Sequence, residues 1–193
     1  MGDELVELLR EHYDLSPDDV VLALRTLPVL RPRAATLTAG QAALLDEVGF
    51  SEEPHAYARA AIDIAAHLGR LIRSAFTANE VAEGLGVTAS RVRQRRLSGG
   101  LWAIEEHGAY LFPVPQFELD ASGDPRKQIR GLDRVFRALP ADLHPVAIDG
   151  FLHTPQTDLQ LDGKLLSPLD WLRSGGDVAA VVGVAEITDW YGR

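Results

Sequence analysis

The stretch VAEGLGVTASRVRQRRLSGGLWAI, residues 81–104, sets the architecture of the middle of this chain. It follows Thr77 and Glu80, whose spacing is that of a capping box, so we expect a short helix to begin there. That helix should end at Gly84 and Gly86, and Thr88 is a second good N-cap for the arginine-rich run that follows. Two short helices joined by a turn that contains glycine form a helix-turn-helix.

The outer face of the second helix carries the side chains of interest. Val92 is apolar and should point into the first helix, near the small residue Ala82, so the helical period places Ser90 and Gln94 on the opposite side. Serine, glutamine and arginine suit the reading of base edges in a major groove, and arginine also binds phosphates. We therefore expect these residues to contact DNA: Thr88, Ser90, Arg91, Arg93, Gln94, Arg95 and Arg96.

Charge is distributed unevenly along the chain. The 193 residues carry a formal net charge of −9, yet residues 59–137 hold 12 basic and 9 acidic side chains, a net +3. The flanking parts carry −7 over residues 1–58 and −5 over residues 138–193. Because nucleic-acid binding depends on the local field, the overall acidity does not exclude it. The alternative interpretation is that the arginines form the solvated face of an ordinary helix.

The residues after the arginine run predict a β-hairpin. Two short apolar segments over 101–112 surround a turn in which Gly108 can adopt a positive φ. The run SRVRQRRLSGGLWAIEEHGAYLFPVPQF, residues 90–117, resembles the winged helix-turn-helix of excisionase and MerR-like proteins. In those families the hairpin serves as a wing with a basic tip, whereas this chain has Glu105 and Glu106 there.

The rest of the chain favours helices. Amphipathic patterns and capping residues predict helices over 4–12, after Ser16, over 38–49 and over 54–73. The run 125–140, PRKQIRGLDRVFRALP, predicts one more helix. Its arginines would share a face that we expect to be solvated or internal rather than bound to phosphate: Arg126, Arg130, Arg134 and Arg137.

Near the C-terminus, the pattern predicts a turn, a short helix at 169–173 and a second helix from about residue 177. The expected fold is mainly α, in three parts. These are a helical region at 1–75, a winged helix-turn-helix with a short β-hairpin at 76–118, and a small helical C-terminal domain at 125–193.

A second resemblance lies in LDGKLLSPLDWLRSGGDVAAVVGVA, residues 161–185. It is similar to the toxin-binding segment of Xre/MbcA/ParS-type antitoxins, in which a proline precedes a short helix ending in Trp-Leu, followed by a glycine and an apolar helix. The matching positions are Pro168, Trp171, Leu172, Gly175, Gly176, Val178, Val181 and Val182. The resemblance implies a segment that occupies the active-site cleft of a RES-domain toxin, an enzyme that consumes NAD⁺.

Large aromatic side chains near the C-terminus are also of a kind enriched at protein interfaces. The expected partner contacts are Pro168, Trp171, Leu172, Gly175, Trp190, Tyr191 and Arg193. The alternative for Trp171 is an ordinary place in the core, and Trp190 and Tyr191 could equally pack on the chain itself.

Other functional classes find no support in the sequence. There is no cysteine, and the six histidines lack the spacing of metal ligands. Neither a glycine-rich phosphate loop nor a nucleophile elbow is present, so we expect no catalytic residue, no metal and no cofactor. The acidic, amphipathic start and the lack of a long apolar run predict a cytoplasmic protein without a membrane partner.

Together these patterns predict a DNA-binding antitoxin, not an enzyme, that represses its own operon and neutralises a toxin from the adjacent gene. Operators of such modules are usually palindromic, so we expect a homodimer, with helix 54–73 as its contact. One alternative is a plain helix-turn-helix regulator whose C-terminal domain only oligomerises. Another is a partner-binding protein whose helix-turn-helix no longer binds DNA.

Overall fold

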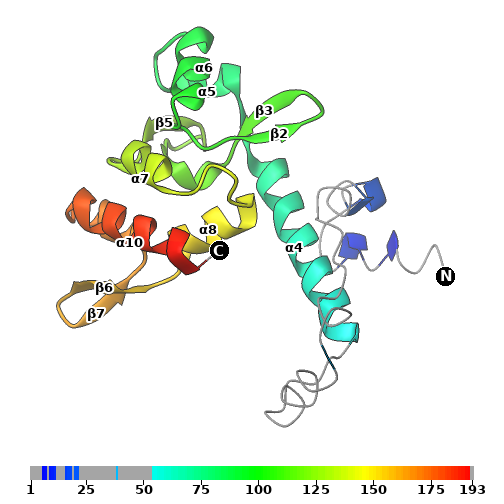
Figure 1. Cartoon of the computed structure of the whole chain (residues 1–193). Helices are drawn as coiled ribbons and strands as arrows, with labels where there is room; N and C mark the ends of the chain where they lie inside the picture. The colour runs from blue at the N-terminus through cyan, green and yellow to red at the C-terminus, as the bar shows by residue number, and fades with distance from the viewer. Residues whose placement is uncertain are drawn as a thin grey trace. The chain divides into compact units, whose positions relative to one another are not determined.

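The structure is a computed structural model that describes residues 54–191 together with short pieces of the N-terminal region (6–7, 9–11, 16–18, 20–21 and 38). Within the long part, residues 54–58 and 188–191 are described as backbone only. The chain divides into two compact units, Met1–Arg70 and Leu71–Arg193 (Figure 1). Each unit is described by itself below.

Most of the long amphipathic helix α4 (Pro54–Ser74) belongs to the first unit, which it leaves after Arg70, and part of its apolar stripe is used within that unit. Leu9 and Ala66 are buried against each other, and Val20 packs at the edge of the pair. The expected helix over 54–73 is therefore confirmed, and its proposed dimer contact stays a prediction. Apart from Thr38, the helix expected over 38–49 lies outside the described residues.

The second unit begins with a helix-turn-helix packed on a small sheet. Its elements are β1 (Phe76–Thr77), α5 (Ala78–Gly84), α6 (Ala89–Leu97), β2 (Ile104–Glu106) and β3 (Ala109–Phe112). The antiparallel sheet has the order β1-β3-β2, with Phe76 opposite Phe112 and Ile104 opposite Leu111. The expected helix pair and hairpin are thus confirmed, and β1 adds an edge strand that the sequence did not predict.

Local side-chain chemistry explains where α5 and α6 begin and end. The Thr77 hydroxyl accepts from the Glu80 amide at 3.3 Å, while the Glu80 carboxylate accepts from the Thr77 amide at 2.6 Å, which completes the capping box. Gly86, at φ 62°, provides the left-handed turn residue between the helices. One buried cluster joins the helices to the sheet: Val81, Ala82, Val92, Leu101, Phe112 and Phe117.

The run 125–140 does not form the single helix that its pattern suggested. After a 3₁₀ turn, its region contains β4 (Phe117–Leu119), β5 (Pro125–Gln128) and α7 (Leu132–Ala138), and β4 pairs with β5. The Asp120 carboxylate accepts from the amides of Ser122 and Asp124, which closes the loop between the strands. Gly131, at φ 88°, then separates β5 from α7. A left-handed residue at this point is incompatible with a continuous helix.

The C-terminal part combines helices with another hairpin. In chain order it contains α8 (Pro145–His153), β6 (Gln156–Leu161), β7 (Lys164–Leu166), α9 (Pro168–Arg173) and α10 (Val178–Tyr191). The helices expected at 169–173 and from about residue 177 are confirmed, whereas α8 and the β6–β7 hairpin were not predicted. None of the helices in the described residues is long and apolar enough to cross a membrane.

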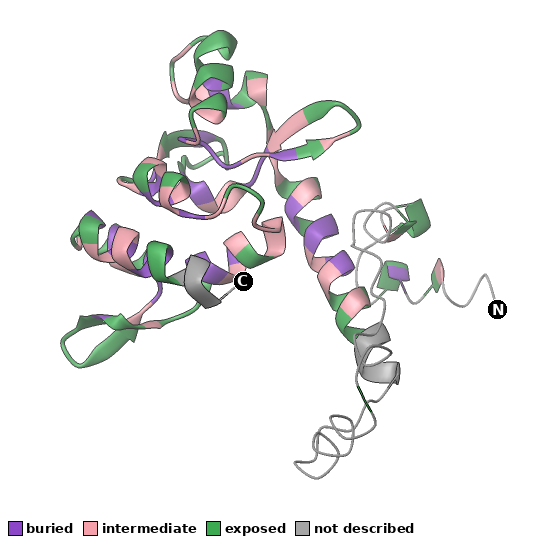
Figure 2. Ribbon diagram, in the orientation of Figure 1, coloured by how far each residue is buried: buried purple, intermediate pink, exposed green. Residues whose placement is uncertain are grey.

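The prediction of a mainly α fold is wrong. The described region is about 54% helix and 18% strand, with three small antiparallel sheets. Four of the seven strands in the described residues, β1, β2, β4 and β7, have only two or three residues, whereas the period-two alternation that identifies a strand needs four to eight. Strands β5 and β6 are longer, but their sequences PRKQ and QTDLQL are mostly polar. Figure 2 shows the β6–β7 hairpin largely exposed.

Candidate nucleic-acid interface

Helix α6 is fixed at its start by Thr88 and along its inner side by Val92. The Thr88 hydroxyl accepts from the Arg91 amide at 3.2 Å, so this predicted contact residue serves as the N-cap. Val92 is completely buried between α5 and the sheet. With these two positions fixed, the remaining face of α6 is presented outward (Figure 2).

Four of the predicted DNA contacts lie on that outward face. Ser90, Arg91, Arg93 and Gln94 are all exposed. The Arg91 guanidinium donates to the Gln94 side-chain oxygen at 2.7 Å, which orders two neighbouring polar groups on the surface. Leu97 ends this face with 67% of its surface exposed. Sequence reasoning missed Leu97, although the helical period places it beside Gln94 and an apolar side chain there suits a thymine methyl group.

Arg96 is held by the hairpin instead of pointing away from the protein. Its guanidinium carbon lies 3.5 Å from the centre of the Tyr110 ring, a cation–π contact. The Tyr110 hydroxyl in turn donates to the Glu105 carboxylate at 3.1 Å. This residue therefore attaches α6 to strands β2 and β3.

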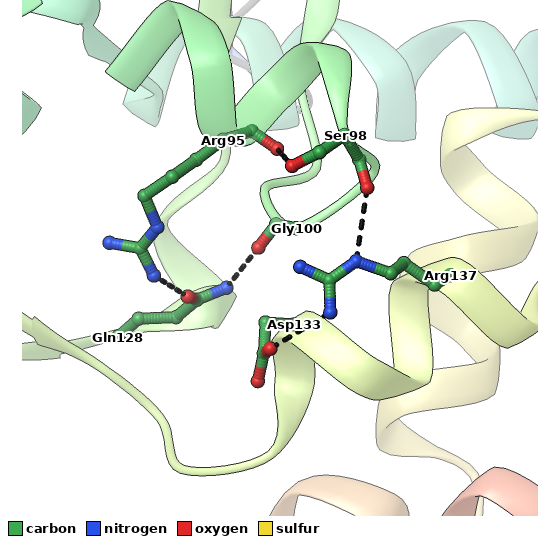
Figure 3. A network of polar contacts seen from close by, with 6 residues as sticks. All are labelled: Arg95, Ser98, Gly100, Gln128, Asp133 and Arg137. Carbon is green, nitrogen blue, oxygen red and sulfur yellow. Dashed lines mark hydrogen bonds and ion pairs between the residues drawn. The ribbon is translucent and has the colours of Figure 1, made fainter. Parts of the chain in front are cut away.

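Arg95 is likewise engaged within the unit. Its guanidinium donates to the side-chain oxygen of Gln128 on β5, and the Gln128 amide donates to the Gly100 carbonyl at 2.8 Å (Figure 3). Because the Gln128 side chain bonds both to the last turn of α6 and to the loop that follows it, it holds the C-terminal end of that helix against β5.

Arg137 of α7 makes a second attachment to the same turn. Its Nε donates to the Ser98 carbonyl at 3.0 Å, and its Nη1 donates to the Asp133 carboxylate at 3.1 Å (Figure 3). The carboxylate aims the guanidinium, and the guanidinium satisfies a carbonyl at the end of α6. The orientation of α6 is therefore set from its inner side, from the hairpin and from α7.

The predicted arginine face of residues 126–137 is divided among different roles. The Arg130 guanidinium donates to the carbonyls of Gly175 and Gly176 at 3.3 and 3.1 Å, and so closes the end of α9. Arg137 is bound as described, whereas Arg126 and Arg134 are exposed. Arg130 and Arg137 thus have internal roles, whereas the exposure of Arg126 and Arg134 suits solvent and phosphate equally, and the four residues do not share one helix face.

The tip of the β2–β3 hairpin is acidic and tightly turned. His107 and Gly108 have φ values of 48° and 80°, and the imidazole of His107 lies 3.4 Å from the Glu106 carboxylate. With Glu105 on the same strand, this hairpin presents carboxylates where a wing that bound phosphates would present lysine or arginine.

Gln116 fixes the base of the hairpin and was missed by sequence reasoning. It is completely buried: its oxygen accepts from the Trp102 amide at 3.1 Å, and its amide donates to the carbonyls of Trp102 and Pro113 at 2.8 and 3.1 Å. These bonds join the chain entering β2 to the chain leaving β3. The one signal in the sequence is a polar residue between Pro115 and Phe117, at a place where the apolar pattern predicts a buried position.

The predicted partner contacts near the C-terminus are mostly part of the fold. Pro168 and Leu172 are buried. The Trp171 indole donates to the Asp177 carbonyl at 2.9 Å and its ring packs against Gly176. Gly175 turns the chain at φ 87°. The side chains of Trp190 and Tyr191, and the whole of Arg193, lie outside the described residues.

Within the described residues, no group of three or more histidine, aspartate or glutamate side chains could hold a metal ion. No protein-family model matches this chain, and no curated protein or solved structure gave a significant match to it.

Proposed function

We propose that this chain is a transcriptional regulator that reads double-stranded DNA by inserting α6 into the major groove. The observation that carries the proposal is the outward face of α6: Ser90, Arg91, Arg93 and Gln94 are exposed together, while Val92 anchors the opposite side. A helix held rigidly by its surroundings and presenting these groups is the geometry that base reading requires.

The division of roles within the arginine run follows from the contacts. Arg91 and Arg93 are the exposed pair and can make bidentate bonds to guanine, and Gln94 can pair in the same way with adenine. Arg95 and Arg96 instead orient the helix through Gln128 and Tyr110. Base discrimination therefore belongs to the first group, at about 1–3 kcal/mol for each good bidentate pair.

Selection of bound duplexes from a random DNA pool tests the proposal. The unmodified chain should enrich a defined sequence, and the R91A/R93A variant should lose that enrichment and bind the selected duplex at least tenfold more weakly, since two base contacts are worth roughly 2–6 kcal/mol. The K164A/R173A variant is the matched control, because it removes the same charge from exposed positions on β7 and α9. Equal affinity of R91A/R93A and the control would contradict the assignment of α6.

The resemblance of residues 161–185 to antitoxins supports a second, more specific proposal. The regulator would act as a homodimer in the cytoplasm and would neutralise a RES-type toxin from the adjacent gene. Since Trp171 packs within the fold, the contact would be made by exposed apolar side chains beside α9. Leu161 and Leu165 on the β6–β7 hairpin are 45% and 44% exposed and are the candidates for this contact.

Co-purification with the product of the neighbouring gene tests this second proposal. A complex should form with the unmodified chain and fail with the L161D/L165D variant. The L119D variant, which changes a 43% exposed leucine on β4, should keep the complex. If no complex forms while DNA selection succeeds, the chain is a plain regulator and the C-terminal resemblance is misleading.

A further inference from the structure

The two sides of α6 differ in charge. Arg93 and Arg96 line a hollow between α6 and β3, and the hairpin on that side carries Glu105 and Glu106. On the other side, Arg91 and Arg95 line a hollow between α6 and α7. A helix in the major groove lies between two phosphate backbones, so the two sides meet different strands.

The side away from the hairpin continues onto β5. A further hollow lies next to the one between α6 and α7 and also has Arg95 in its wall. It extends over Arg126, Lys127 and Arg130. Strand β5 is bulged at Arg126, because Lys127 pairs with Glu118 and Pro125 pairs with Leu119, so strand alternation does not decide where this side chain points. Arg126 and Lys127 nevertheless line the same hollow as Arg95 of α6. Figure 1 shows β5 and the β2–β3 hairpin on different sides of the helix pair.

The walls of these two hollows are mainly basic, and Asp120 lies near enough to Arg126 to interact with it. Among the described residues, the two hollows have six basic residues in their walls and one carboxylate, Asp133. That carboxylate is already bonded to Arg137 at 3.1 Å. The ion pair of Lys127 with Glu118 is 3.8 Å long between side chains that are 64% and 50% exposed, so a phosphate can replace it at little cost.

We infer that Arg126 and Lys127 on β5 bind the phosphate backbone at one edge of the major groove that α6 enters, in place of the acidic hairpin. This inference rests on the proposed function, because it requires a duplex on α6. It assigns base reading to α6 and most contacts with the DNA phosphate backbone to β5. Contacts made by Arg126 and Lys127 would not depend on the DNA sequence.

The salt dependence of binding gives the magnitude. Each phosphate contact on duplex DNA contributes about 0.9 to the slope of the logarithm of affinity against the logarithm of salt concentration. Loss of two contacts should therefore lower the slope by about 1.8. Between 50 and 200 mM salt, the advantage of the unmodified chain over a variant that lacks both contacts should shrink roughly twelvefold.

The test measures fluorescence anisotropy of a labelled 25-base-pair duplex of arbitrary sequence across that salt range. We expect R126A/K127A to show the reduced slope, both on this duplex and on one that carries a selected site. The control K164A/R173A removes the same two charges and should keep the slope of the unmodified chain. Thermal unfolding of each variant checks that the fold is retained.

The outcomes separate the inference from the function it rests on. If R126A/K127A keeps the full slope while R91A/R93A loses binding, β5 does not touch the backbone and the DNA-reading function stands. If K164A/R173A lowers the slope as much as R126A/K127A does, the effect is one of net charge and the inference is wrong. If the unmodified chain fails to bind either duplex, both proposals fall.

Discussion

Replacement of Gln116 by methionine should lower the free energy of unfolding of the second unit more than a substitution at any exposed position does. Methionine keeps the length of the side chain but removes three buried hydrogen bonds to Trp102 and Pro113. Leaving the buried Trp102 amide without a partner costs about 1–3 kcal/mol, and the two carbonyls add to that. After a small gain from burying an apolar group, we expect a net loss of roughly 3–5 kcal/mol in the free energy of unfolding.

Urea and thermal unfolding followed by circular dichroism measure this loss. For a unit of this size the change should lower the melting temperature by roughly 10–15 °C. The control is Gln160→Met on β6, the same substitution at an exposed position, which should stay within about 0.5 kcal/mol of the unmodified chain. A loss below about 1 kcal/mol for Gln116→Met would refute the view that these bonds hold the base of the hairpin.

Three further substitutions test other features of the second unit. Gly131→Ala should lower the free energy of unfolding in urea by about 2–5 kcal/mol, because its φ is 88° and a Cβ would lie 2.5 Å from a Val178 methyl group. The control Gly163→Ala, with φ 78° and open space around it, should cost only the backbone strain of about 1–2 kcal/mol. Thr77→Ala should cost about 1 kcal/mol through the lost cap of α5, and an unchanged urea midpoint would show that the cap contributes nothing. Burial lowers the pKa of His144 in the folded state, so its imidazole takes up a proton more readily in the unfolded chain than in the folded one. The free energy of unfolding should therefore fall as the pH drops below about 6.5. His144→Asn keeps an acceptor at the start of α8 and should flatten that fall in melts between pH 7.5 and 5; equal slopes for both proteins would exclude this histidine as its source.

The elements that the sequence predicted well are those with local signals. Thr77, Glu80, Thr88 and Gly86 act through bonds or dihedral angles within a few residues of themselves, so their positions in the sequence suffice to place α5 and α6. The outward direction of Ser90 and Gln94 follows in the same way from the helical period.

The elements that the sequence did not predict depend on distant partners. Strand β5 is polar, PRKQ, and exists because it pairs with β4 across a loop closed by Asp120. The helical period already turns Arg95 and Arg96 towards the body of the unit, on either side of Val92, and leaves Arg91 and Arg93 beside the outward face. What the sequence did not predict is their partners: Gln128 and Tyr110 bind Arg95 and Arg96 from other parts of the chain, in place of the phosphates that were expected.

If α6 reads DNA as proposed, the separation of roles along this helix has a consequence for how the protein would change its target sequence. Ser90, Arg91, Arg93 and Gln94 are exposed, and substitutions at exposed positions usually shift stability by no more than about 0.5 kcal/mol. New base preferences would then arise at these four positions without any repair elsewhere in the chain. Substitution of Arg95 or Arg96 would instead remove contacts that hold α6 and disturb every proposed base contact at once. Retargeting by design should accordingly randomise positions 90, 91, 93 and 94 and leave 95 and 96 unchanged.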